Sequence, residues 1–184
     1  MNEVQINIEY LPSYNLKEWG PLSYAKDGDA GFDLRAAITE PCVLQCMQSY
    51  IEENGYPHER TTTIGIRIET CIKFEHTNNL QIPVPCGVKI SVPEGFQLEV
   101  RPRSGLAFKH GLTIVNSPGT IDSGYTGQIL AIMFNMGSTD ITINPGDRIA
   151  QAVLMPYYHA KFNIVERLEE TSRGESGLGS TGVK

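Results

Sequence analysis

Short runs of alternating apolar and polar residues recur along the chain, and glycine or proline interrupts them. Alternation is the period of a strand with one buried face, and it is clear in residues 4–10, 63–69 and 88–92. The turns that glycine and proline predict lie at Pro83, Pro85, 93–95, 118–119 and 145–146. No stretch keeps a helical period for three turns, and the best short helix is 103–109. The pattern predicts an all-β barrel or sandwich with little helix.

Length and charge narrow the class of protein further. A chain of 184 residues, 40% of them apolar, normally forms one domain that buries about 70% of its unfolded surface. The formal charge of −6 repels nucleic-acid phosphates, so bulk DNA or RNA is not expected as a partner. The longest apolar run, 129–134, is far shorter than the roughly 20 residues of a membrane-spanning helix. The first residues do not resemble a leader peptide, so we expect a soluble, cytoplasmic protein without a membrane partner.

Four cysteines allow two interpretations. Without a leader peptide, the expected state is reduced thiols in an ordinary core. The alternative is a zinc site, for which the available ligands are Cys42, Cys46, His58, Cys71, His76 and Cys86. Structural zinc sites usually have two close ligand pairs, and only Cys42 and Cys46 form one here, so buried thiols are the favoured interpretation.

Two segments stand apart from the rest. Residues 42–79 carry a charged turn of their own and two strand-like runs, which predicts an inserted hairpin and a candidate surface for an unknown protein partner. Residues 173–184 are rich in glycine and hydroxyl side chains that cannot form a core, which predicts a flexible arm unless a ligand orders it. We therefore divide the chain into a β domain, 1–172, and an arm, 173–184.

One glycine-rich loop has the residues for nucleotide chemistry. Two strand runs, 112–116 and 128–134, flank it and predict a hairpin that presents Asp122 and Tyr125. Hairpin backbone groups can bind a flat polar ring, an aromatic side chain can pack on a sugar, and a carboxylate can orient a water molecule. The alternative is that Asp122 and Tyr125 only shape the turn.

Three further segments can bind phosphate or metal. Arg103 and Ser104 follow a strand run and open the short helix, whose first N–H groups can bind phosphate oxygens. Asp33 lies inside an otherwise apolar strand, where an inward carboxylate needs a cation, a hydrated metal or backbone donors. A purely structural pair with an arginine is the alternative for Asp33. Gln151 follows a turn and can donate to phosphate, or it can serve only strand packing.

The tail offers a third possible phosphate ligand. Arg173 stands beside closely spaced glycines and Ser180–Thr181, a composition whose amides can form an anion-binding nest and whose guanidinium can clamp a phosphate. A flexible linker is the alternative interpretation of this segment.

Five of these segments, in this order, match a known pattern. DAGFDLRAA, PRSGLA, GTIDSGYTGQI, GDRIAQAVL and RGESGLGSTG closely resemble the five motifs of the trimeric dUTPases, and the likeness extends from about Val4 to Gly182. The resemblance implies a jelly-roll-like (β-clip) subunit that assembles as a homotrimer. It also implies Mg²⁺-dependent hydrolysis of dUTP to dUMP and pyrophosphate, which limits uracil incorporation into DNA and supplies dUMP for dTMP synthesis.

The resemblance also implies a role for individual residues. Asp122 would orient the water that attacks the α-phosphate, and Asp33 would reach magnesium through water. The residues implied to read the uracil edge and pack on the deoxyribose are Asn116, Thr120, Ile121 and Tyr125. The residues implied to bind phosphates are Arg103, Ser104, Gly105 and Gln151. The residues implied to belong to the closing arm, commonly over another subunit's site, are Arg173, Leu178 and Gly179.

Two departures from the family and two rival functions remain. The family usually lacks a segment like 42–79, and at the position of Leu178 it has a phenylalanine that stacks on uracil.

A dCTP deaminase would need an added acid or base in the hairpin, and Asp122 is the only carboxylate between Gly119 and Gln128. A regulatory or binding protein on the same fold would not need Asp33, Asp122 and Arg173, and all three are present.

Overall fold

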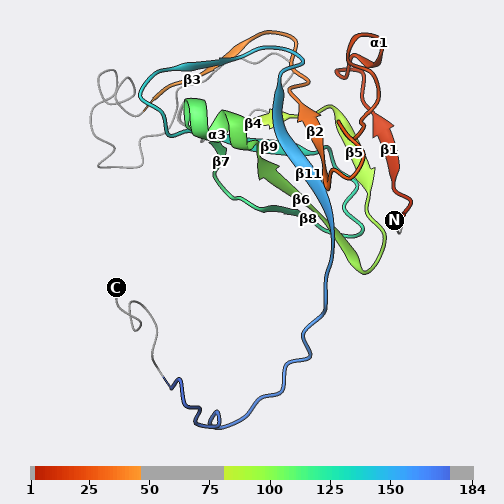
Figure 1. Ribbon diagram of the computed structural model, residues 1–184. Helices are drawn as coiled ribbons and strands as arrows, with labels where there is room; N and C mark the ends of the chain where they lie inside the picture. The colour runs from red at the N-terminus through yellow and green to blue at the C-terminus, as the bar shows by residue number, and fades with distance from the viewer. Residues whose placement is uncertain (1–2, 47–80, 175–184) are drawn as a thin grey trace.

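The computed structural model describes residues 3–46 and 81–174, and the described chain is mostly β with two short helices (Figure 1). The helices are α1 (Leu16–Trp19) and α3 (Ser104–His110). The strands are β1 (Asn7–Tyr10), β2 (Gly31–Arg35), β3 (Cys42–Leu44), β4 (Gln81–Pro85), β5 (Val88–Ser91), β6 (Phe96–Pro102), β7 (Leu112–Ile114), β8 (Gly119–Ile121), β9 (Leu130–Asn135), β10 (Ile141–Ile143) and β11 (Arg148–Pro156). The predicted all-β class and the predicted short helix are confirmed. Neither described helix has the length and apolarity to cross a membrane.

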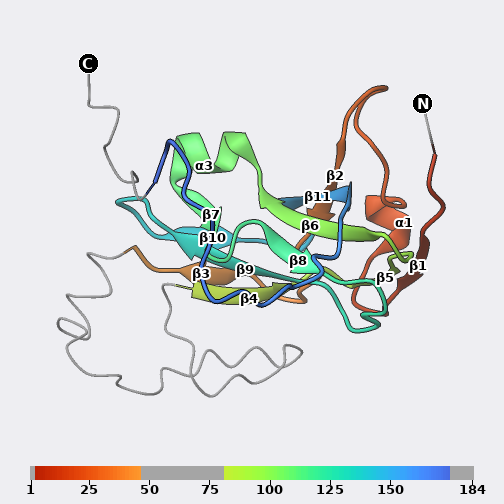
Figure 2. The ribbon, with the colours of Figure 1, turned by 90° about the horizontal axis from the view of Figure 1, so that it is seen from below.

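The described strands form four antiparallel sheets. The largest has the order β2-β11-β6-β8, and a second has the order β4-β9-β7. The pairs β1-β5 and β10-β3 complete the set, and no sheet among the described strands closes into a barrel. Figures 1 and 2 show β1, β5 and α1 together at one end of the body, and α3, β7 and β10 at the other.

The core lies between the sheets and is built from the apolar half of each alternating strand. In β2, Phe32 and Leu34 are buried, and in β9 alternate residues from Ala131 to Asn135 are buried. Burial of such side chains contributes about 1.5–3 kcal/mol each for the large ones. Cys42, Cys46 and Cys86 are buried here too, in the location predicted for core thiols. Cys71 and the two histidines of the alternative zinc site lie outside the described residues.

Pro83 and Pro85 do not mark turns, contrary to the sequence prediction. Both lie inside β4, where they pair with Ile132 and Leu130 of β9. β4 is an edge strand of its sheet and pairs only with β9. A proline there therefore removes no hydrogen bond to a strand on the other side. The turn after β4 uses Gly87 instead, whose φ of +69° favours glycine.

The first residues of the predicted insertion belong to the core. β3 pairs with β10, and Cys42 and Leu44 are buried. The amide of Cys46 donates to Oδ1 of Asp140 at 2.8 Å. Residues 42–46 therefore belong to the described body and not to a separate hairpin. The remainder of the predicted insertion, including the predicted strand 63–69, lies outside the described residues, and its binding role stays a prediction.

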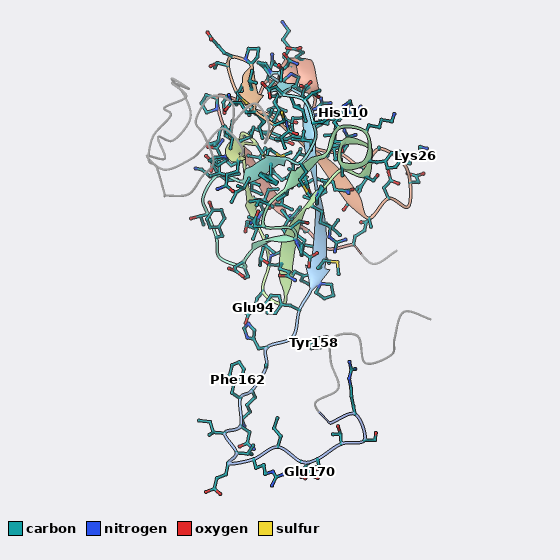
Figure 3. All side chains as sticks on the ribbon, turned by 90° about the vertical axis from the view of Figure 1, so that its left-hand side faces the viewer. Lys26, Glu94, His110, Tyr158, Phe162 and Glu170 are labelled. Atoms are coloured by element: carbon teal, nitrogen blue, oxygen red, sulfur yellow. The ribbon has the colours of Figure 1, made fainter. Side chains whose placement is uncertain are left out.

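The described chain continues past β11, its last strand, as an extended segment. Residues 157–174 contain no helix or strand, and the segment extends away from the sheets (Figure 1). Tyr158 and Phe162, labelled in Figure 3 beyond Glu94, are 98% and 90% exposed. Ile164 is 97% exposed. We call residues 157–174 the extended arm.

Candidate active site

Asp33 lies on the outer face of the largest sheet. Its neighbours Phe32 and Leu34 point into the core, so alternation turns Asp33 the other way, and its side chain is 25% exposed. The prediction that this carboxylate points inward is therefore wrong, because the apolar positions of β2 are the even-numbered ones. In the register of the sheet, Asp33 lies beside Gln151 of β11.

Two arginines hold the Asp33 carboxylate. Arg103 Nε donates to Oδ1 at 2.8 Å, and Arg148 Nη1 donates to Oδ2 at 3.3 Å. Arg103 also donates from Nη1 to the carbonyl oxygen of Arg148 at 3.0 Å. The structure thus contains the carboxylate–arginine pair that the sequence offered as an alternative for Asp33. We call Asp33, Arg103 and Arg148 the arginine–aspartate cluster.

A β-bulge turns Arg148 toward this cluster. Arg148 lies opposite Arg35 and Ala150 lies opposite Leu34, so β11 has one extra residue at this point. In a regular strand, Arg148 and Gln151, three residues apart, would point to opposite faces. The extra residue places both on the face of Asp33, which is a common use of bulges near functional sites. Gln151 Nε2 donates to the carbonyl oxygen of Pro102 at 2.8 Å.

Helix α3 adds backbone donors to the same region. The helix begins at Ser104, directly after β6, and both Ser104 and Gly105 are exposed. The first amides of a helix have no intrahelical acceptor and can bind an anion. Gly111, with φ +69°, ends the helix.

These groups surround an open cavity of about 650 Å³. It is lined by β2, β6, α3 and β11 and by the loop before β2. The lining includes His110 and Ala25, and Ala25 precedes Lys26; both labelled residues can be located in Figure 3. The cationic side chains of the lining are Arg101, Arg103, Lys109 and Arg148. Its carboxylates are Asp29 and Asp33, so the cavity is locally positive although the chain carries −6.

The predicted hairpin forms only in part. β7 and β9 do pair, with Leu112 opposite Asn135 and Ile114 opposite Met133. Their connection is not a simple loop, because it contains β8, which joins β6 of the largest sheet. Sequence patterns could not show this, since β8 is only three residues long, too short for an alternating pattern to signal a strand.

Asp122 and Tyr125 lie directly after β8. Asp122 is exposed, and Tyr125 is 43% exposed. The Tyr125 hydroxyl donates to the carbonyl oxygen of Gln128 at 3.0 Å, and its ring lies so close to Gly127 that a Cβ there would overlap it. Asn116 and Thr120 are also exposed, and Ile121 is half-buried. The loop therefore presents the residues that the sequence assigned to the nucleoside.

The cavity and this loop are well separated within one chain. Gly119 lies opposite Val100 and Ile121 opposite Leu98, so β8 runs away from Arg103. Asp122, the next residue, lies near the level of Gln97 on β6. Gln97 is six residues before Arg103, a separation of roughly 20 Å at ~3.3 Å per residue. Among the described residues, none between 111 and 147 lines the cavity. One chain thus contains two half-sites, which we call the phosphate half-site and the nucleoside half-site.

The arm residues are placed only in part. Arg173 lies at the exposed end of the extended arm, outside both half-sites. Leu178 and Gly179 lie outside the described residues.

Sequence reasoning missed the other basic side chains of the cavity lining, namely Arg101, Lys109, His110 and Arg148. Arg148 stands inside the matched segment GDRIAQAVL, so its presence was visible, but the bulge that aims it was not. Arg101 precedes the segment PRSGLA and lies on the outward face of β6 with Glu99, and Arg101 Nε donates to Glu99 Oε2 at 2.8 Å.

Asp33 offers the cavity a place to hold a magnesium ion through water. No group of three or more metal-ligating side chains occurs among the described residues. Magnesium, however, usually keeps several waters and is held by one or two carboxylates plus substrate phosphates. Each oxygen of Asp33 accepts one arginine hydrogen bond and retains a lone pair for a metal-bound water.

Fold and geometry define the class: a β protein with an open, locally positive cavity and a separate loop that exposes a carboxylate and an aromatic ring. The family model for dUTPase matches residues 57–182. The deoxyuridine 5'-triphosphate nucleotidohydrolase of Treponema denticola is 40% identical over 169 residues, which are 91% of this chain and 95% of that protein. The enzyme of the same name from Fusobacterium nucleatum is 38% identical over 182 residues and covers 99% of both chains. The chain belongs to the dUTPase family.

Solved structures show the same fold. A mutant dUTPase of Staphylococcus bacteriophage 80alpha, solved with dUpNHpp, matches with a TM-score of 0.68 at 22% identity. The match covers 97% of this chain and 99% of that one. The dUTPase from phage phi11 of S. aureus matches with a TM-score of 0.62 at 20% identity, over 91% of this chain and all of that one.

Proposed function

We propose that the protein is a dUTP diphosphatase that hydrolyses dUTP to dUMP and pyrophosphate with Mg²⁺. The observation that carries the proposal is the sorting of the matched segments into two chemically distinct half-sites. One gathers cations and helix amides around a cavity. The other exposes a carboxylate and an aromatic ring on one loop.

The phosphate half-site binds the triphosphate. Arg103, after β6, and Arg148 and Gln151, both of β11, supply side-chain donors, and Ser104 and Gly105 add the start of α3. Hydrolysis between the α- and β-phosphates requires in-line positioning and charge neutralisation more than covalent chemistry. When bound, magnesium supplies further neutralisation of the phosphate charge. Asp33 is the residue that would hold it through water.

The nucleoside half-site selects the uracil ring and the deoxyribose. It also supplies the general base of the reaction. Asn116 and the backbone from Thr120 to Asp122 read the uracil edge. Tyr125, held by its hydrogen bond to Gln128, packs on the deoxyribose and leaves no room for a 2′-hydroxyl. Asp122 orients and deprotonates the attacking water, and its exposure leaves its carboxylate accessible to that water.

Assembly joins the two half-sites. Because they lie roughly 20 Å apart along β6 in one chain, a complete site needs the loop of one subunit against the cavity of another. A homotrimer provides three such sites by cyclic symmetry. The extended arm supports association, since Tyr158, Phe162 and Ile164 are almost fully exposed in a single chain. Arg173, near the end of the extended arm, then reaches a site on another subunit.

Pyrophosphate release from each deoxynucleotide and from UTP tests the activity. With Mg²⁺ we expect rapid turnover of dUTP and much slower turnover of dCTP, dTTP and UTP. Asp122→Asn should keep nucleotide affinity and lose roughly 10²-fold or more in kcat, the scale of removing a positioned base. Release of ammonia from dCTP at a rate similar to dUTP hydrolysis would instead identify a deaminase.

A further inference from the structure

Trp19, the only tryptophan of the chain, packs against the turn that precedes Arg148. The turn connects β10 to β11, and Gly146 within it has φ +83° and is buried. A Cβ at Gly146 would come within 2.6 Å of Trp19 Nε1 and 2.8 Å of Cε2. The indole therefore lies close against Gly146, where any side chain would have to displace it.

Hydrogen bonds connect this turn rigidly to β2. Gly146 N donates to the carbonyl oxygen of Ala36, and Ala36 N donates to that of Asp147, both at 2.8 Å. Arg35 Nη1 donates to the carbonyl oxygen of Gly146 at 2.8 Å. Arg148 follows immediately, and its guanidinium reaches Asp33 while its carbonyl accepts from Arg103. The indole thus covers the turn whose next residue enters the phosphate half-site.

Trp19 also packs against a second aromatic residue, Tyr14. Its ring meets that of Tyr14 edge-on at 5.2 Å, and Tyr14 packs against Tyr10 at 4.8 Å. Tyr14 is buried and donates from its hydroxyl to the carbonyl oxygen of Gly20, directly after α1. The three rings form a contiguous aromatic cluster that packs with the core.

We propose that Trp19 is a positioning residue of the phosphate half-site. It presses on Gly146, fixes the turn, and so fixes the direction in which the bulged strand presents Arg148. The phosphate-binding use of Arg148 rests on the proposed function, whereas the mechanical link from Trp19 to Arg148 does not. Arg148 is half-exposed, so its orientation depends on its backbone and on Asp33 more than on core packing.

A double-mutant cycle tests the link, with inorganic tripolyphosphate as the probe and calorimetric Kd as the readout. Trp19→Ala should weaken tripolyphosphate binding by about 5- to 10-fold, and Arg148→Met by about 10-fold or more, the scale of one charge-assisted hydrogen bond. In the Arg148→Met background, Trp19→Ala should have little further effect. Full additivity, or an unchanged Kd in Trp19→Ala, would overturn the proposal.

Two measurements separate positioning from loss of folding. Amide exchange at Gly146 should accelerate in Trp19→Ala and be intermediate in Trp19→Phe, which keeps a smaller ring on the turn. Tyr10→Phe is the matched control: it removes the hydroxyl that accepts from Leu22 N at 2.8 Å and leaves Trp19 in place. It should lower thermal stability without changing tripolyphosphate Kd, and an equal loss of affinity in this control would overturn the proposal.

Turnover of dUTP by the unmodified protein distinguishes the two claims. If the protein binds tripolyphosphate, couples Trp19 to Arg148, and leaves dUTP intact, the proposed function fails while the positioning role of Trp19 stands. If dUTP is hydrolysed and the cycle is additive, the positioning role fails while the proposed function stands.

Discussion

Replacing Gly111 by alanine should destabilise the protein through two separable effects. Gly111 ends α3 with φ +69°, a left-handed conformation that costs an alanine about 1 kcal/mol. Its Cβ would also lie 2.5 Å from the amide nitrogen and 2.8 Å from the Cα of Gly137. Both contacts are with backbone, which cannot rotate away as a side chain can. Overpacking of this kind costs about 1–3 kcal/mol, so the total loss should be about 2–4 kcal/mol.

Gly95→Ala is the matched control for the conformational part. Gly95 has φ +85°, and nothing lies within 4 Å of its Cβ position. This substitution should therefore cost only the left-handed strain, about 1 kcal/mol. The difference between the two variants measures the contact between the end of α3 and the turn after β9.

Thermal unfolding followed by circular dichroism measures both losses. For a chain of this size, 1 kcal/mol shifts Tm by about 2–4 °C, so Gly95→Ala should lower Tm by that amount and Gly111→Ala by roughly 5–15 °C. Protein concentration must be held fixed, because subunit association makes Tm depend on it. Equal shifts in the two variants would refute the reasoning, since they would show that the backbone contact at Gly137 is absent or freely yields.

Three further predictions concern the cluster, the core and the arm. Asp33→Asn should lower the free energy of unfolding by about 1–2 kcal/mol, because Arg103 loses a charged acceptor in a partly exposed pair, and an unchanged urea midpoint would contradict this. Burial raises the pKa of Cys86 to about 12 from the usual 9.0, so above pH 9 the unfolded chain loses a proton that the folded chain keeps. Stability should fall between pH 9 and 12 by up to ~1.4 kcal/mol per pH unit, and Cys86→Ala should show a shallower fall in urea titrations across that range. Replacing both Phe162 and Ile164 by serine should weaken subunit association in sedimentation velocity, and an unaltered assembly would argue against a docking role for the arm.

Sequence patterns were sufficient where side-chain chemistry and backbone geometry agree. The alternating runs at β1 and β5 mark real strands. The inner residues of β5, Val88 and Ile90, are buried, and those of β1, Ile8 and Tyr10, are partly buried against the core. The segment after Pro102 forms α3 as predicted, because it has no β-branched run and Gly111 is available to end it. The pairing of Asp33 with an arginine was among the sequence alternatives, since a carboxylate in an apolar strand needs a cation.

Sequence patterns failed where tertiary pairing decides the structure. The bulge that turns Arg148 toward Asp33 depends on the register between β11 and β2, which no local signal specifies. β8 leaves the predicted hairpin because it finds a partner in β6, far away in sequence. Pro83 and Pro85 look like strand breakers, but an edge strand tolerates them.

The separation of the half-sites was likewise not visible in the sequence. Five short segments in order indicate one site, and the structure distributes the described ones over two places in a chain. Residues 119–121 pair along β6 toward its beginning, whereas Arg103 follows its end. Only the register of that pair shows that Asp122 and Arg103 of one chain cannot act on the same phosphate.

Complementation between two inactive variants tests the shared site most directly. Asp122→Asn and Arg103→Ala subunits, each inactive alone, would be co-expressed with different tags and assayed for dUTP hydrolysis. In random trimers about three quarters are mixed, and each mixed ring has one interface at which an intact Asp122 meets an intact Arg103 of its neighbour. The account predicts recovery of about a quarter of the activity of the unmodified trimer. No recovery in mixed trimers of confirmed composition would mean that both residues act within one chain, and it would contradict the account.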